Sequence, residues 1–579
     1  MQQRIRGVLC ICIGLLFVLI ARTAYLQLWD GPNSGASLAN KALRLRLQYL
    51  SGEEFNRGEI LDRNMLSLTD SAVRPALVAF PLSIRDLSAV AQYLEKNLGL
   101  KAAETEKALE RAQKYYGPRN PVILQVNLSS AEIEKFQGNT INGLAILPLK
   151  NRYGPNSLAR HLIGHLNSID ERKWQSLGQA RRTIEKNPDL PTAYRLTDKI
   201  GVAGLEERYE NALRGSKSEY TLGGLADADG RLLQGLGYKI QPDQADSWRN
   251  HLILTLDREY QQIAEEVLDR HVTKGAVVVL DIATSDVLAV ASRPNYDQNM
   301  VSKYLDGRDK LLDRSERVAF YPGSVFKVVV AAAALEENLC DLEEIFTCTG
   351  SYQFADGTEI SCSRPHGEVD LNQAIIRSCN TTFIQLGQRL GNEKLRSYAE
   401  KLGITIHLKA NSPPAFLGNS SIGQEGVLVS PLQIANLYAT LAREGLYLPW
   451  RTVAEIRNYQ SDLIQEYPQQ APQRVLQGRT CQLINQALIE TARSGSGQLA
   501  WLKEYGSAGK TGTAQANNNN RVIAWYAGFA PAENPHLAIA VMVEEDKSGS
   551  STGLRGGNTA APIFREIAER ILLKEGVIQ

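Results

Sequence analysis

Cysteine and histidine are scarce in this sequence, and the few that occur are scattered. Seven cysteines and seven histidines are spread over 579 residues, with no C-x-x-C pair and no H-E-x-x-H motif. Disulfide-built proteins contain a much higher proportion of cysteine, and structural zinc sites usually show closely spaced Cys and His pairs. The composition therefore argues against a disulfide scaffold and against a metal site, and we expect no cofactor.

One pair of cysteines leaves two interpretations open. Cys348 and Cys362 flank a short polar loop, which is compatible with a disulfide between them. Two free thiols are the alternative, and we favour it.

The sequence also lacks an excess of charge of either sign. Lys and Arg number 64, and Asp and Glu number 63, so the net charge is +1. Binding of nucleic acid through overall charge needs a basic surplus, so we expect no nucleic-acid partner. With 43% hydrophobic and 22% charged residues over 579 positions, the chain is an ordinary folded protein with several cores.

Long apolar runs are absent except at the N-terminus. Residues 7–21 are an uncharged run, preceded by Arg4 and Arg6 and followed by Arg22. Counted to Trp29, the segment approaches the roughly 20 residues that a spanning helix needs. A cleaved signal peptide is the alternative, but no A-x-A-like site follows the run. We expect residues 1–29 to form a cytoplasmic tail and a single uncleaved transmembrane helix.

The rest of the chain divides into two regions of different texture. Residues 30–246 alternate short strand-like pieces with charged amphipathic helices, which predicts an elongated mixed pedestal. Residues 247–579 predict an α/β (α+β) domain: an antiparallel sheet that is assembled from both ends of the segment, is flanked by helices, and contains a helical subdomain. The strands expected in that sheet are 275–280, 287–291, 508–516, 522–530 and 537–544, with helices at 259–271 and 561–573.

A serine and a lysine stand at the start of an unusually apolar helix. Ser324 and Lys327 precede a run that continues to Leu335 without a polar residue, so we expect this helix to be buried. Residues three apart on a helix share a face, and an unprotonated amine there can accept the hydroxyl proton. Burial and a second cation nearby would lower the lysine pKa enough for that role.

Two further patterns follow in the chain. Lys510-Thr511-Gly512-Thr513 places a lysine, a glycine and two hydroxyls on an expected strand, where an extended ligand with a carboxylate can pair with the strand edge. Ser378 and Asn380, two residues apart, can relay a proton and bind an amide. A second S-x-x-K match at Ser507 lacks a helical context, and Lys547-Ser-Gly549 lies in a polar loop, so neither is assigned a role.

The order of these three patterns is typical of serine β-lactamases and penicillin-binding proteins. Over most of its length the chain resembles the class B high-molecular-mass penicillin-binding proteins. The other segments that carry this resemblance are Arg57-Gly-Glu-Ile-Leu-Asp-Arg63, Arg152-Tyr-Gly-Pro155 with His161-Leu-Ile-Gly164, Gly201-Val-Ala-Gly-Leu-Glu206, Lys274 to Asp281, Ser421-Ile-Gly-Gln424 with Ser430-Pro-Leu-Gln433, and Trp525 to Pro531. The sequence departs from the usual pattern of this family at residues 64–69 and 283–285. Elongation, division and sporulation therefore all stay open as the cellular role.

The resemblance implies a peptidoglycan D,D-transpeptidase that cross-links stem peptides ending in D-Ala-D-Ala and is acylated by penicillin and other β-lactams. Ser324 would be the nucleophile and Lys327 its base. Ser378 would pass the proton to the leaving group, and Asn380 would hold the donor amide. Lys510 would bind the terminal carboxylate and help keep the pKa of Lys327 low.

The resemblance extends to substrate binding, partners and location. Thr511, Gly512 and Thr513 would line the bound peptide, with the N–H groups of Ser324 and Thr513 forming the oxyanion hole. Residues 30–246 would be the dimerisation or pedestal domain, and 247–579 the penicillin-binding domain. The chemistry takes place outside the membrane, so the N-terminus would be cytoplasmic. A polytopic membrane glycosyltransferase is the expected partner.

Two other functions use the same acylation site. A membrane-anchored β-lactamase needs a base for deacylation, and Glu368-Val-Asp-Leu-Asn372 matches the E-x-x-L-N pattern of class A enzymes. Here the pattern precedes Ser378, whereas in those enzymes it follows the corresponding motif. A β-lactam-sensing receptor is the non-enzyme alternative, but such sensors resemble proteins with several spans.

Overall fold

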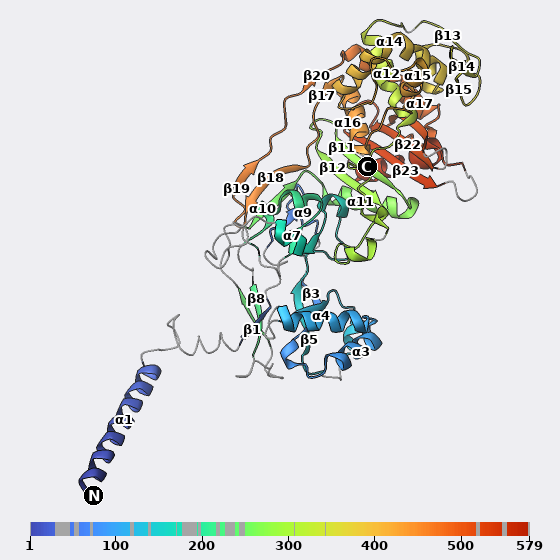
Figure 1. Cartoon of the computed structure of the whole chain (residues 1–579). Helices are drawn as coiled ribbons and strands as arrows, with labels where there is room; N and C mark the ends of the chain where they lie inside the picture. The colour runs from blue at the N-terminus through green and yellow to red at the C-terminus, as the bar shows by residue number, and fades with distance from the viewer. Residues whose placement is uncertain are drawn as a thin grey trace. The chain divides into compact units, whose positions relative to one another are not determined.

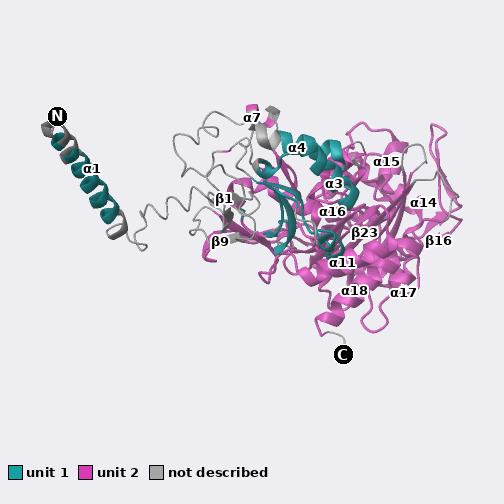
Figure 2. Ribbon diagram, turned by 90° about the horizontal axis from the view of Figure 1, so that it is seen from below, with its two compact units in different colours: residues 1–57, 71–152, 215–246 teal, residues 58–70, 153–214, 247–579 magenta. Residues whose placement is uncertain are grey.

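The computed structural model divides the described part of the chain into two compact units, coloured in Figure 2. Unit 1 comprises residues 1–57, 71–152 and 215–246, and unit 2 comprises 58–70, 153–214 and 247–579. Within these ranges the structure describes residues 2–28, 47–50, 57–69, 73–115, 121–136, 141–169, 171–176, 194, 199–215, 220–225, 238–242, 249–305, 307–341, 343–516, 521–546 and 553–576. Lys547-Ser-Gly549 and the expected boundary at 246/247 lie outside the described residues.

The N-terminal apolar run forms helix α1 (Gln2–Leu28). Several of its large apolar side chains are exposed, among them Leu16, Phe17 and Leu19. A search of the described residues for a helix long and apolar enough to cross a membrane found none. The expected transmembrane helix at 1–29 is therefore not supported.

The described residues of unit 1 form two three-stranded sheets. One has the order β1-β8-β9, and the other has the order β4-β3-β5 with antiparallel pairing throughout. Helices α3 and α4 pack on each other beside the second sheet, and Leu77, Val90 and Leu94 lie in the core they share. The elements are β1 (Leu47–Leu50), β3 (Val73–Ala79), α3 (Leu87–Leu98), α4 (Ala102–Tyr115), β4 (Val122–Gln125), α5 (Ser130–Glu134), β5 (Leu144–Lys150), β8 (Tyr220–Leu225) and β9 (Tyr238–Pro242).

The main sheet of unit 2 has five antiparallel strands in the order β12-β11-β23-β22-β21. The first two come from the start of the segment and the last three from its end, so the predicted assembly from both ends is confirmed. The strands are β11 (Gly275–Asp281), β12 (Val287–Arg293), β21 (Ala508–Ala516), β22 (Arg521–Ala530) and β23 (Leu537–Asp546). β21 is an edge strand, since it pairs only with β22 in this order.

The sheet is covered on both faces, which explains its continuous apolar strands. Successive side chains of β11 alternate between two cores: Val277 and Val279 lie in the core with helices α11 (Arg258–His271) and α18 (Ala561–Lys574), and Val278 and Leu280 lie in the other. That second core is formed with α12 (Lys327–Glu336) and α16 (Pro431–Ala442). The sheet therefore presents one face to a large helical region.

The predicted helical subdomain is inserted between β12 and β21. Figure 1 shows α12, α14, α15 and α17 gathered beside the small strands β13 to β15. The elements of the insertion are β13 (Phe346–Cys348), β14 (Ser351–Gln353), β15 (Glu359–Ser361), β16 (Gly367–Val369), α13 (Leu371–Ile376), α14 (Asn380–Lys401), α15 (Pro414–Ser421), β17 (Leu446–Tyr447), β20 (Gln473–Arg474) and α17 (Gly478–Arg493).

The remaining strands in the described part of unit 2 form two small sheets. A four-stranded sheet has the order β19-β18-β10-β2, in which β10 pairs with β2 in parallel and with β18 antiparallel. The elements are β2 (Ile60–Leu61), α6 (Arg160–Ile163), β6 (Leu166–Ser168), α7 (Glu171–Ser176), β7 (Lys199–Gly201), α9 (Gly204–Arg208), α10 (Glu210–Leu213), β10 (Asn250–Leu254), β18 (Val453–Asn458) and β19 (Leu463–Glu466). Unit 2 thus contains residues 58–70 and 153–214, which the sequence assigned to the pedestal, so the three-part division stays a prediction.

Candidate active site

Ser324 lies on a single 3-10 turn (Gly323–Phe326) that leads directly into α12. Ser324 is partly exposed, whereas Lys327 and the seven residues after it are buried, which confirms the predicted burial of this helix. The turn needs a glycine at 323, where φ is +57° and a Cβ atom would lie 2.7 Å from the carbonyl oxygen of Thr513. This close approach brings residues 321–326, which we call the serine turn, against strand β21.

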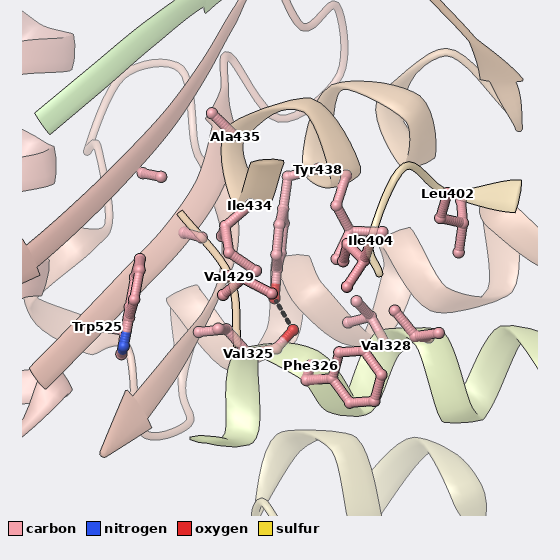
Figure 3. Packing of buried hydrophobic residues seen from close by; sticks show 14 of the residues in the cluster. Val325, Phe326, Val328, Leu402, Ile404, Val429, Ile434, Ala435, Tyr438 and Trp525 are labelled. Carbon is pink, nitrogen blue, oxygen red and sulfur yellow. Dashed lines mark hydrogen bonds between the residues drawn. The ribbon is translucent and has the colours of Figure 1, made fainter. Parts of the chain in front are cut away.

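Three contacts from other elements hold the serine turn. The Gly323 N–H donates to the Gly423 carbonyl at 2.8 Å. The Trp525 indole donates to the Tyr321 carbonyl at 3.0 Å. Figure 3 shows Tyr438 of α16 beside Val325, to whose carbonyl oxygen its hydroxyl donates at 3.1 Å. The sequence indicated the segments of Gly423 and Trp525 by resemblance only, and gave no signal for Tyr438.

Lys327 joins the first pattern to the second. Its Nζ donates to the Ser378 carbonyl at 2.8 Å, to Ser378 Oγ at 3.3 Å and to Asn380 Oδ1 at 2.7 Å. Among the described residues no hydrogen bond links Ser324 Oγ to Lys327 Nζ. The structure thus brings together two patterns that are about 50 residues apart in the sequence.

Ser378 has a left-handed backbone, with φ of +58°. This conformation costs a non-glycine residue on the order of 1–2 kcal/mol, and such residues cluster at functional sites. Here it allows both the carbonyl and the hydroxyl of Ser378 to accept from Lys327. Asn380 is fixed in turn by its Nδ2, which donates to the Ser361 carbonyl at 2.7 Å.

The third pattern lies on edge strand β21. Lys510 is fully buried, and its Nζ donates to the Thr511 carbonyl at 3.3 Å. The Thr511 hydroxyl shares a 2.7 Å hydrogen bond with that of Ser496, while Thr513 is exposed. A Cβ at Gly512 would lie 2.7 Å from the Pro322 carbonyl oxygen. The sequence interpretation reserved this glycine for the approach of substrate, but its close neighbour is the protein's own serine turn.

Burial controls the charge of the two lysines. It lowers the pKa of Lys327 to about 8, and the nearby Cys362 and Cys379 thiols oppose that fall. The pKa of Lys510 is lowered well below its usual value, first by burial and then by the charge of Lys327. The expected repulsion between the two lysines lowers the pKa of Lys510. For Lys327, burial is the largest cause of the lowered pKa. A neutral amine is therefore available near neutral pH.

An unexpected cluster lies beside the second pattern. Cys348, Cys362, His366 and Cys379 bring their potential ligand atoms within 4.8 Å of one another. All three cysteines are free thiols, so of the two interpretations of the Cys348 and Cys362 pair the structure shows free thiols. The ligands are spread from 348 to 379 without a C-x-x-C pair. Cys362 and His366, four residues apart, are a closely spaced pair that the interpretation of the sequence missed.

The rejected or competing residues lie elsewhere in the structure. Ser507 is fully buried and its hydroxyl donates to the Ala500 carbonyl at 2.8 Å, which is a structural contact. Glu368 is exposed on β16, opposite Thr347 in the register of strand β13. No hydrogen bond or ion pair connects Glu368 to Ser324 or Lys327 among the described residues.

Comparison with protein families gives two matches. The family model described as the penicillin binding protein transpeptidase domain matches residues 275–569. The model described as the penicillin-binding protein dimerisation domain matches residues 53–239. The first match spans the serine turn, Ser378 with Asn380, and strand β21.

Curated proteins and solved structures agree with these matches. The chain is 26% identical to stage V sporulation protein D of Bacillus subtilis, covering all of this chain and 86% of that protein. It is also 26% identical to the peptidoglycan D,D-transpeptidase MrdA of Acinetobacter baumannii, covering 97% of this chain and 88% of that protein. The crystal structure of PBPA from Mycobacterium tuberculosis is similar, with a TM-score of 0.52, 27% identity, and coverage of 56% of this chain and 82% of that one.

Proposed function

This chain belongs to the penicillin-binding protein transpeptidase family, and from that premise we infer that it is a class B peptidoglycan D,D-transpeptidase. Two of its relatives carry that activity or a sporulation role in their names. The enzyme cross-links stem peptides ending in D-Ala-D-Ala through a serine acyl-enzyme, and penicillin acylates the same serine. Elongation, division and sporulation all stay open as its cellular role.

The contact of the buried Lys327 amine with Ser378 and Asn380 is the observation that carries the mechanism. We assign Ser324 as the nucleophile: its Oγ attacks the carbonyl carbon of the penultimate D-Ala, and its proton passes to neutral Lys327. Hydrogen bonds of a catalytic base often align only when substrate binds, so the present orientation of Lys327 toward Asn380 is compatible with this step.

Breakdown of the tetrahedral intermediate breaks the carbon–nitrogen bond of the donor peptide. The proton reaches the departing D-Ala amine through the Ser378 hydroxyl, which lies 3.3 Å from Lys327 Nζ. An amine of a second stem peptide then attacks the ester, and Ser324 regains its proton as the cross-link forms. The reaction exchanges one amide for another and needs no cofactor.

Substrate binding is assigned to edge strand β21. An extended peptide can pair with this edge, with Lys510, Thr511 and Thr513 disposed toward its terminal carboxylate. We place the oxyanion hole at the N–H groups of Ser324 and Thr513. The support is that the Thr513 backbone nitrogen lies 3.3 Å from the position that a Cβ on Gly323 would occupy. A donor of this kind contributes about 3–4 kcal/mol to lowering the barrier.

The β-lactamase alternative is not favoured. Hydrolysis needs a base that activates water at the acyl-enzyme. Glu368, the only candidate that the sequence offered, is exposed on β16 without a contact to Ser324. The family match and the named relatives favour an enzyme over a β-lactam sensor.

The finer assignments of domains and location belong to this proposal. We assign residues 30–246 to the pedestal or dimerisation domain and 247–579 to catalysis, supported by family matches within each range. The family is associated with the membrane, and the exposed apolar side chains of α1 support attachment through residues 1–29. The N-terminus would then be cytoplasmic and the catalytic domain extracytoplasmic, where the substrate is.

A polytopic membrane glycosyltransferase is the proposed partner that supplies glycan strands. The support for this partner is the resemblance to class B penicillin-binding proteins. A purified full-length protein that polymerises lipid-linked disaccharide by itself would contradict this assignment.

The proposed function is tested by cross-linking with purified components. Full-length wild type, Ser324→Ala and Ser507→Ala are compared for release of D-Ala and for the mass of cross-linked muropeptides. Wild type and Ser507→Ala should retain D-Ala release, because the Ser507 hydroxyl is buried and donates to the Ala500 carbonyl. Ser324→Ala should lose it. D-Ala release that persists in Ser324→Ala would overturn the assignment of the nucleophile.

A further inference from the structure

The four-residue cluster beside the second pattern is made by separate small elements. Cys348 ends β13, Cys362 follows β15, His366 precedes β16, and Cys379 caps α14. Cys348 and Cys379 are buried, at 1% and 0% exposure. Strands β13 to β16 form only two short pairs of three positions each, so the convergence of four polar side chains there needs a reason.

Three of the distances between ligand atoms in the cluster match those of a tetrahedral ligand shell. Cys348 Sγ lies 3.7 Å from Cys362 Sγ and 3.5 Å from His366 Nδ1, and Cys362 Sγ lies 3.9 Å from Cys379 Sγ. Bonds of about 2.3 Å from zinc to sulfur and about 2.05 Å to nitrogen, at tetrahedral angles, place two sulfurs about 3.8 Å apart and a sulfur and a nitrogen about 3.6 Å apart. A disulfide would need about 2.05 Å between the sulfurs.

We propose that Cys348, Cys362, His366 and Cys379 bind one zinc ion as a closed Cys3His site. Three thiolates and an imidazole favour zinc over the hard cations magnesium and calcium, which take oxygen ligands. Four protein ligands leave no open position for water, which identifies a structural site rather than a catalytic one.

Hydrogen-bond donors around the sulfurs support thiolate ligands. The backbone N–H of Asn380 donates to Cys362 Sγ at 3.0 Å, and the Thr382 hydroxyl donates to Cys379 Sγ at 3.3 Å. Such contacts to ligand atoms orient a metal site and tune its affinity. They come from the first turn of α14, so the same turn that carries Asn380 closes the shell.

The zinc would position the catalytic loop. Cys379 stands between Ser378 and Asn380, the two residues that accept from Lys327 Nζ. An ion bound to Cys379 and to Cys362 would tie this loop to the strand hairpin β14–β15. It would thereby hold the strained Ser378 backbone and the Asn380 side chain in place without contacting substrate. This role rests on the proposed function, whereas the metal site does not.

Metal content tests the site directly. Full-length wild type, Cys362→Ser and Cys481→Ser are purified in parallel, and zinc per chain is measured by elemental mass spectrometry. Cys481 is a buried free thiol of α17 outside the cluster, which makes it the matched control. Wild type and Cys481→Ser should hold about one zinc per chain, and Cys362→Ser should hold less than about a tenth of that.

A spectroscopic measurement on wild type guards against misfolding of the variant. Replacement of the zinc by Co²⁺ should give the intense thiolate-to-metal charge-transfer band and the visible bands of a tetrahedral site. The proposal would be overturned if wild type contains no zinc as purified and binds no Co²⁺. It would also be overturned if Cys362→Ser holds as much zinc as wild type. A disulfide found by peptide mapping between any two of the three cysteines in the purified protein would also overturn it.

The link to catalysis is measured separately. Removal of zinc from wild type by a chelator should slow penicillin acylation at least tenfold, and added zinc should restore the rate. An unchanged rate in protein shown to be zinc-free would overturn the positioning role while leaving the metal site standing. Ser324→Ala should lose penicillin labelling but keep its zinc. This result would show that the assignment of the nucleophile and the zinc site can be tested independently.

Discussion

The pH dependence of penicillin acylation follows from the burial of Lys327. Acylation needs the neutral amine, and burial lowers the pKa of Lys327 to about 8 from the usual 10.5. With that value, about 9% of the amine is neutral at pH 7 and about 91% at pH 9. The second-order acylation rate should therefore rise roughly tenfold over this range and level off above pH 8 to 9.

An unburied lysine would behave differently. With a pKa of 10.5, the neutral fraction would grow roughly a hundredfold between pH 7 and pH 9 and would still be rising. The assay is stopped-flow or quenched labelling of full-length protein with a fluorescent penicillin, with Ser324→Ala as the blank. A hundredfold rise without a plateau would refute the lowered pKa of Lys327, and a rate independent of pH would refute its assignment as the base.

Three further predictions concern the neighbours of this pair. Lys510→Ala should slow acylation about 10²-fold or more, because it removes the amine that we assign to the substrate carboxylate. Burial lowers the pKa of this amine in the free enzyme, and a bound carboxylate would favour its protonated form. Lys510→Arg should recover part of the rate because a guanidinium is positively charged. Equal rates for both variants in the labelling assay would contradict an electrostatic role. Glu368→Gln should leave the release of bound penicillin unchanged, because the exposed Glu368 makes no described contact with Ser324. A ~10²–10⁴-fold fall in the rate of penicilloic acid release, which is typical of losing a general base, would identify a β-lactamase. Tyr438→Phe should lower the free energy of unfolding by about 1–3 kcal/mol, because the Val325 carbonyl loses its buried donor. Denaturant unfolding measures this loss, with Tyr352→Phe as the control because the Tyr352 ring is partly exposed. Equal unfolding free energies for the two variants would refute the prediction.

Local sequence patterns predicted the main sheet well, because its strands are long apolar runs bounded by turns. The runs at 275–280 and 537–544 became neighbouring strands β11 and β23, paired from Gly275 opposite Val543 to Asp281 opposite Leu537. The helix after Ser324 was predicted for the same reason, since every residue from Lys327 to Ala334 is buried. Only the 3-10 geometry of its first turn departed from the expectation.

Local sequence patterns could not predict the contacts between segments that lie far apart in the chain. The Gly323 N–H donates to the Gly423 carbonyl a hundred residues later, and no local pattern links the two glycines. The Cys3His cluster has the same origin, because its ligands come from the end of β13, the β15–β16 connection and the start of α14, which meet only when the chain folds. Resemblance pointed to the right segments, but not to what they touch.

Identification of the acylated residue tests the central claim most directly. Full-length protein is incubated with penicillin, digested, and mapped by tandem mass spectrometry. The account predicts a single penicilloyl adduct on Ser324, within the peptide that contains Lys327, and no adduct on Ser378 or Ser507. An adduct on another serine, or stoichiometric labelling that persists in Ser324→Ala, would contradict it.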